Sequence, residues 1–75
     1  MIAITKNELK ILTYLINNKG KIVSRDALMD YLWDNDEFID DNTLTVNINR
    51  LRGKLSDLGH NDMIQTRRGQ GYIIL

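Results

Sequence analysis

The sequence contains no cysteine and only one histidine, so it cannot form a disulfide, a thiolate metal site or a pair of imidazole ligands. It also lacks an apolar run of the roughly 20 residues that span a bilayer, and a signal-peptide pattern. No nucleophile stands in a recognisable pattern with a base, and no complete dinucleotide-binding glycine motif is present. These absences argue against an enzyme, a metal or cofactor site and a membrane protein, and they leave a cytoplasmic domain as the expectation.

Net charge is absent too, because ten Lys and Arg balance ten Asp and Glu. The two signs are nevertheless separated along the chain. Residues 1–41 carry five cations against eight anions, a balance of −3, and residues 42–75 carry five cations against two anions, a balance of +3. This asymmetry predicts that the C-terminal half faces a charged partner.

Seventy-five residues form one small domain, near the lower size limit for an independent core. A capping box of Thr5 and Glu8 opens a first helix, and Gly20 is suited to end it. Ser24 caps a second helix, and the acidic segment 34–41, which lacks helical periodicity, separates it from a third. The pattern predicts the order helix, strand, helix, loop, helix, hairpin.

The third predicted helix, residues 42–58, has two faces of different chemistry. Helical spacing puts one apolar stripe on it, made of Leu44, Ile48, Leu51, Leu55 and Leu58. The opposite face carries Asn42, Val46, Asn49, Arg50 and Gly53, flanked by Thr43, Asn47 and Lys54. It has no carboxylate, whereas a merely solvated face usually mixes Glu with Lys. Amides, arginine and a small apolar group are the side chains that read adenine, guanine and the thymine methyl in the major groove.

Two short segments that read as strands, 63–66 and 72–75, flank the basic, glycine-rich segment 67–71 and predict a hairpin with a tight turn. A lone hairpin is only marginally stable in water, so we expect residues 22–23 to join it as a third strand. The predicted fold class is α+β. It is a winged helix-turn-helix, with three helices and a small antiparallel sheet that ends in a C-terminal hairpin, the wing.

These features resemble the winged-helix effector domain of OmpR/PhoB-type response regulators. The matching blocks are residues 4–12 (ITKNELKIL), 20–28 (GKIVSRDAL), 32–33 (LW), 42–55 (NTLTVNINRLRGKL) and 64–72 (IQTRRGQGY). The last two blocks, at this separation, are the specific part of the resemblance. The chain is thus interpreted as a single domain over residues 1–75. It lacks the family's receiver domain and most of its N-terminal four-stranded sheet, for which residues 2–4 are a candidate remnant. We expect an excised part of a two-domain regulator or a short stand-alone relative.

The resemblance implies sequence-specific binding of double-stranded DNA by the effector domain of a two-component system transcriptional regulator. Helix 42–58 would enter the major groove, and the tip 67–71 the adjacent minor groove. The full-length protein would bind promoter direct repeats as a dimer after phosphorylation of its receiver domain, and RNA polymerase would be a partner. The alternative is a winged-helix protein-interaction module that acts through the acidic 34–41 loop.

The predicted DNA contacts divide by the part of the DNA they meet. Val46, Asn49 and Arg50 would contact bases, with Arg50 bidentate to guanine. The residues expected at phosphates are polar or cationic, and they are Thr43, Asn47, Arg52, Lys54, Thr66 and Arg67. If Lys54 contacts phosphate, its removal flattens the dependence of log affinity on log salt by about one unit. Alternatively, Thr43 caps the helix and Arg50 pairs with a surface carboxylate.

By the same resemblance, Arg68 is inserted into the minor groove, where the potential is most negative in narrow A/T tracts. The alternative is a turn that only improves solubility. Trp33, Phe38 and Ile39 would contact RNA polymerase, or else Trp33 and Phe38 simply close the small core. The acidic loop is not a calcium-binding loop, because the glycine and glutamate needed at its sixth and twelfth positions are missing.

Overall fold

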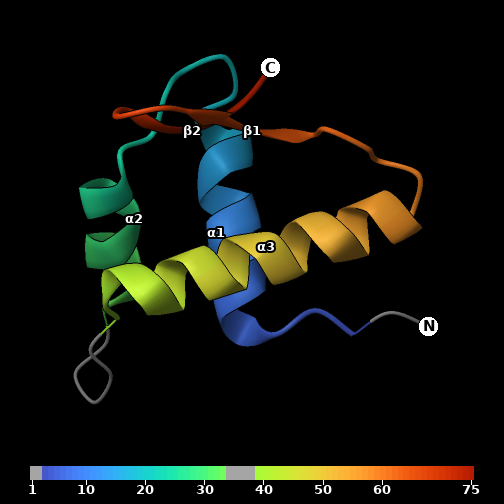
Figure 1. Cartoon of the computed structure of the whole chain (residues 1–75), viewed down its shortest axis with the longest axis horizontal. Coiled ribbons are helices and arrows are strands. Elements are labelled where there is room, and N and C mark those ends of the chain that lie inside the picture. Colours follow the sequence, from blue (N-terminus) through green and yellow to red (C-terminus); the bar gives the residue numbers. More distant parts are fainter. Residues whose placement is uncertain (1–2, 34–38) are drawn as a thin grey trace.

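A computed structural model describes residues 3–33 and 39–75 of the chain. Its elements are α1 (Lys6–Asn17), α2 (Arg25–Leu32), α3 (Asp41–Asp57), β1 (Ile64–Arg67) and β2 (Gly71–Ile74). Helix α3 packs across α1, α2 packs beside both, and the hairpin covers the end of α1 (Figure 1). The predicted order of the three helices and the hairpin is confirmed, but the described residues between α1 and α2 form no strand. Within the described residues, no helix is both long enough and apolar enough to cross a membrane.

The first two helices begin at the predicted caps. The Thr5 hydroxyl accepts a hydrogen bond from the Glu8 backbone N–H at 3.2 Å, and the Ser24 hydroxyl accepts one from the Ala27 N–H at 3.0 Å. Each bond satisfies an amide that has no partner within the first turn of its helix. Two short side chains thus fix where α1 and α2 start.

Helix α3 begins one residue earlier than predicted. Its cap is Asp40, whose carboxylate accepts a hydrogen bond from the Thr43 backbone N–H at 2.7 Å. That bond lowers the pKa of the Asp40 carboxyl. The positive end of the helix dipole also stabilises the negative charge of the carboxylate. The alternative role of Thr43 as the cap is therefore wrong.

Helix α3 ends in a Schellman motif, as its glycine predicted. Gly59 has φ 90°, its N–H donates to the Ser56 carbonyl at 2.9 Å, and the His60 N–H donates to the Leu55 carbonyl at 2.8 Å. Leu58 forms the C-cap and is exposed. Its predicted place in the buried stripe is wrong, because Leu55 is the last residue of the stripe that the core covers.

The core draws side chains from every helix and both strands. Leu44, Ile48, Leu51 and Leu55 of α3 are all buried, which confirms the rest of the stripe. The other buried members of the cluster are Ile11, Leu15, Val23, Leu28, Leu32, Ile39, Ile64, Tyr72 and Ile74. Burial of one side of α3 therefore determines which of its side chains point to solvent.

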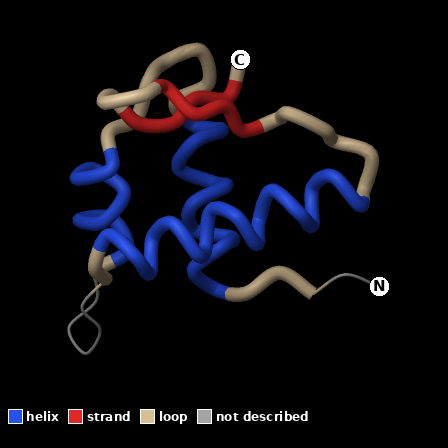
Figure 2. The backbone as a smooth tube through the Cα atoms, viewed as in Figure 1, coloured by secondary structure: helices blue, strands red, loops and turns tan. Residues whose placement is uncertain are grey.

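The hairpin forms a two-stranded antiparallel sheet in which Ile64 pairs with Ile74 and Arg67 with Gly71 (Figure 2). The expected third strand is reduced to a single bridge. The Val23 N–H donates to the Tyr72 carbonyl at 2.8 Å, and the Tyr72 N–H donates to the Val23 carbonyl at 2.9 Å. Helix α2 begins two residues after Val23, which leaves no room for a longer strand. Residues 3–4 lie in no strand, and residue 2 is outside the described residues.

Candidate nucleic-acid interface

The predicted base-reading face of α3 points to solvent. Val46 is 44% exposed, and Asn49 and Arg50 are exposed beside it. They lie opposite the leucine stripe, so packing of α3 against the core presents them outward. An amide, a guanidinium and an apolar side chain on one exposed helix face are chemically suited to base edges in the major groove.

The flank of that face is less exposed than the sequence predicted. Asn47 is only 8% exposed, and its side-chain amide donates to the Thr43 carbonyl at 2.8 Å. A buried amide needs such a partner, and the preceding turn of the same helix supplies it. The structure thus turns Asn47 inward, away from the face on which helical periodicity had placed it.

Lys54 is bonded within the protein. Its ammonium lies 2.9 Å and 2.6 Å from the two carboxylate oxygens of Glu8, whose side chain is 0% exposed. The ion pair ties α3 to α1. Burial raises the pKa of the Glu8 carboxyl, but hydrogen bonds from Lys54 and Thr5 and the charge of Lys54 outweigh it, so the pKa is lowered.

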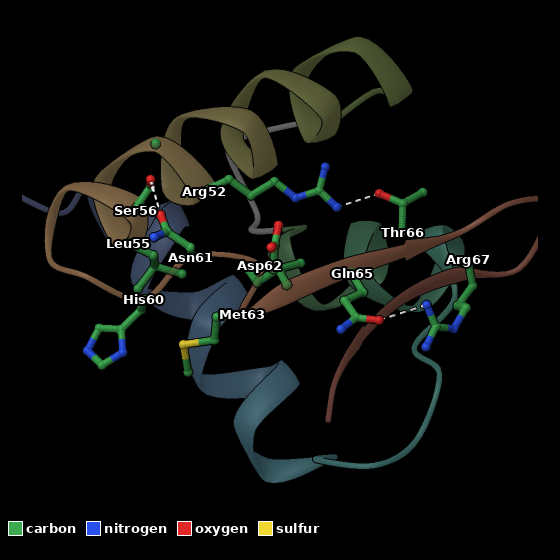
Figure 3. A pocket seen from close by; sticks show the side chains of 12 residues that line it. Arg52, Leu55, Ser56, His60, Asn61, Asp62, Met63, Gln65, Thr66 and Arg67 are labelled. Carbon is green, nitrogen blue, oxygen red and sulfur yellow. Dashed lines mark hydrogen bonds between the residues drawn. The ribbon is translucent and has the colours of Figure 1, made fainter.

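Arg52 joins α3 to the wing. Its guanidinium donates to the Thr66 hydroxyl on β1 and lies 5.7 Å from the centroid of the Tyr72 ring on β2. Figure 3 shows Arg52 reaching from the helix toward Thr66, above a groove between α3 and β1. Arg52 is half-buried and Thr66 exposed. Because they are bonded to each other, both residues lie at the contact between α3 and the wing.

The two wing arginines occupy different positions. Arg67 is half-buried and donates to the Gln65 side chain at 2.9 Å, whereas Arg68 is exposed in the turn that follows β1. The Gln70 N–H donates to the Arg67 carbonyl at 2.9 Å and closes that turn. Gly69 lies in this turn with φ 71°, in agreement with the positive φ predicted for a glycine there. Arg68 is thus presented at the tip.

Arg25, the first residue of α2, is a site residue that no sequence pattern identified. Its guanidinium donates to the Asp41 carboxylate (3.2 Å) and carbonyl (2.8 Å), to the Thr45 hydroxyl (2.9 Å) and to the Tyr72 hydroxyl (2.5 Å). A cation at the N-terminal end of a helix is opposed by the helix dipole. This unfavourable placement is the sequence signal from which a tertiary partner of Arg25 could have been inferred.

The predicted polymerase-contact residues have different environments. Trp33 is 55% exposed at the C-cap of α2, so the alternative in which it closes the core is wrong. Ile39 is 4% exposed within the core cluster, so its predicted place on a contact surface is wrong. It packs inward just before α3 begins. Phe38 and residues 34–37 of the acidic segment lie outside the described residues.

Residues 1–74 match the family of domains described as "Transcriptional regulatory protein, C terminal". The chain belongs to this family. The chain is similar to the response regulator protein GraR of Staphylococcus haemolyticus, with 51% identity over 73 residues, 97% of this chain and 33% of GraR. The resemblance to OmpR/PhoB-type effector domains is confirmed, and the chain is a regulatory domain rather than an enzyme.

Solved structures agree with the winged-helix fold. The C-terminal domain of the nisin resistance regulator NsrR is 44% identical, with a TM-score of 0.85 over 97% of this chain and 74% of that one. The DNA-binding domain of the response regulator AdeR, in complex with an intercistronic region, is 29% identical, with a TM-score of 0.84 over 97% of this chain and 75% of that one. This chain spans about a third of the length of the curated relatives it matches.

Proposed function

We propose that this domain binds specific sequences of double-stranded DNA in the cytoplasm, as the effector domain of a two-component transcriptional regulator. The observation that carries the proposal is the exposed face of Val46, Asn49 and Arg50, which burial of the opposite side of α3 directs outward. A second cation, Arg68, is exposed at the wing tip. A helix that reads the major groove and a basic tip in the minor groove account for both features.

The contacts are assigned by exposure and chemistry. Arg50 pairs with guanine, Asn49 meets a neighbouring base edge, and Val46 meets a thymine methyl. Arg68 enters the minor groove. The proposed phosphate contacts flank these residues and are Thr43, Arg52, Thr66 and Arg67. Asn47 and Lys54 are left out, because the Asn47 side chain is buried and the Lys54 ammonium is held by both oxygens of the buried Glu8 carboxylate.

Substitution of Arg50 tests the base-reading role. We expect Arg50→Ala to weaken binding to a duplex enriched from a random-sequence library by about tenfold to a hundredfold, because a bidentate guanine contact is lost. Arg68→Ala should weaken binding and reduce the preference for an A/T tract beside the major-groove segment. Fluorescence anisotropy with the 75-residue chain measures both. Lys19→Ala, which removes an exposed cation just after α1, is the matched control. Unchanged affinity in both arginine variants would refute the DNA-binding proposal.

The partners of the longer regulator are part of the same proposal. Two copies would bind direct repeats after phosphorylation of the receiver domain, and the exposed Trp33 would contact RNA polymerase. Trp33 supports this role because a large aromatic side chain exposed at the end of a helix is well suited to an interface. Trp33→Ala in the full-length regulator should lower transcription in vitro about tenfold while DNA affinity stays constant. Equal transcription by both proteins would contradict this assignment.

A further inference from the structure

The recognition helix and the wing meet in the shared core and through long side chains that span the interval between them. The backbones of α3 and the hairpin approach each other at few points, whereas β2 packs directly on α1. The relative position of the helix and the wing therefore depends on the residues that span the interval between them. Two arginines and one tyrosine form that link: Arg25, Arg52 and Tyr72.

Tyr72 is the centre of the link. The Arg25 guanidinium lies 5.8 Å from the centroid of its ring, and the Arg52 guanidinium lies 5.7 Å from it. The ring is buried, and cation–π attraction is stronger when the partners are removed from water. The Tyr72 hydroxyl also accepts the 2.5 Å hydrogen bond from Arg25. Both helices of the helix-turn-helix thus hold the strand that follows the wing tip.

Arg25 connects this strand to the start of α3. The same guanidinium that bonds Tyr72 donates to Asp41 and Thr45, which lie on the first turns of α3. Thr45 directly precedes Val46 of the base-reading face, and Tyr72 directly follows Gly71 at the base of the wing. A planar guanidinium has fixed donor directions, so partners that bond to it are held at a fixed separation.

We infer that Arg25 is a positioning residue that sets the separation between the base-reading face of α3 and the wing tip. It thereby selects the number of base pairs between the major-groove and minor-groove contacts. This inference rests on the proposed function. Two DNA-binding elements that are already correctly placed bind two grooves together without the cost of ordering one relative to the other. Loss of the link leaves both elements present but free to adopt several spacings.

The experiment compares three duplexes. One is the parent duplex enriched by the wild-type chain, and the others insert or delete one base pair between its major-groove segment and its A/T segment. We expect the wild type to prefer the parent duplex. Arg25→Met and Tyr72→Phe should bind the parent about tenfold more weakly, since a hydrogen bond to a charged group is lost. Their affinity for the other duplexes should change less, so the preference among spacings shrinks.

Three controls separate positioning from other roles. Tyr72→Phe keeps the ring and removes only the hydroxyl, so it preserves core packing even if Arg25→Met fails to fold. Lys19→Met removes an exposed cation outside the link and should behave as wild type. The slope of log affinity against log salt should be the same in wild type and Tyr72→Phe, and in Arg25→Met if it folds, because no phosphate contact is removed.

Two results would overturn the inference. The first is an equal loss of affinity by Tyr72→Phe on all three duplexes, or no loss at all. The second is a salt slope lower by about one unit in Arg25→Met, which would identify Arg25 as a phosphate contact. Failure of the proposed function is distinguishable from both, because it would appear as unchanged affinity in Arg50→Ala and Arg68→Ala, measured without any change to Arg25.

Discussion

Gly71→Ala is expected to lower the free energy of unfolding by about 3 kcal/mol or more, through strain and overpacking together. Gly71 has φ 147°, a conformation that residues with a side chain rarely adopt. An added Cβ would overlap the Val23 carbonyl oxygen and lie 2.8 Å from the Val23 carbonyl carbon and 2.9 Å from the Ser24 Cα. All three are backbone atoms, so the clash is relieved only by moving the segment that bridges to Tyr72.

The size of this effect matters because the domain is small. A chain of this length has a total stability of roughly 4–11 kcal/mol, at about 0.05–0.15 kcal/mol per residue. Urea unfolding followed by far-UV circular dichroism measures the change. Gly69→Ala is the matched control: Gly69 also has positive φ, at 71°, but an added Cβ there meets no atom within 4 Å. It should cost only about 1–2 kcal/mol, and equal losses in both variants would contradict a role for the contact with Val23.

Most features controlled by local rules were predicted correctly from the sequence, apart from the Asp40 cap of α3 and the exposure of Leu58. Periodicity identified the buried side of α3, and with it the exposure of Val46, Asn49 and Arg50. Caps and glycines marked the helix ends, because Thr5 and Gly59 act on the backbone within a few residues of themselves. The exposure of the proposed base-reading face was predictable because its position depends on the helix repeat and on little else.

Features controlled by distant partners were not predicted. Lys54 and Glu8 are 46 positions apart, and Arg25 and Tyr72 are 47 apart, so no spacing rule connects them. A helical wheel gives the direction of Lys54 but not the carboxylate that meets it. The segment before α3 has no periodicity, and its pattern therefore could not show that Ile39 is buried while Trp33 is exposed. Long-range packing decides both.

Lys54→Met is expected to act on stability and leave the salt dependence of DNA binding unchanged. The variant leaves the buried Glu8 carboxylate without its cation, and breaking a buried ion pair from one side costs about 3–5 kcal/mol. The sequence alone predicted a phosphate contact, whose loss flattens the salt slope by about one unit. The geometry of the ion pair predicts no change in slope, and urea unfolding together with anisotropy at several salt concentrations decides between them.

The paired variant Glu8→Leu with Lys54→Met is the control for the loss of charge. An apolar pair of similar volume is often as stable as a buried ion pair, so the double variant should recover most of the stability that Lys54→Met loses. Recovery shows that the cost arises from the unpaired carboxylate and not from lost packing of the lysine stem. A double variant as unstable as Lys54→Met would contradict the ion-pair explanation.

The pH dependence of the unfolding free energy provides a second measurement of the ion pair between Lys54 and Glu8. Because the folded pKa of Glu8 is lowered from its ordinary value of 4.5, the ion pair contributes its full stability above that value. The contribution is lost as the pH falls through the folded pKa, where the carboxyl becomes protonated. In Lys54→Met the carboxyl is buried without a cation, so its pKa rises and protonation relieves the destabilisation. The difference in unfolding free energy between wild type and Lys54→Met should therefore shrink as the pH falls from the raised pKa of the variant, above 4.5, to the lowered pKa of the wild type, below 4.5. A difference that stays constant from pH 7 to pH 3 would show that Lys54 does not change the pKa of the Glu8 carboxyl.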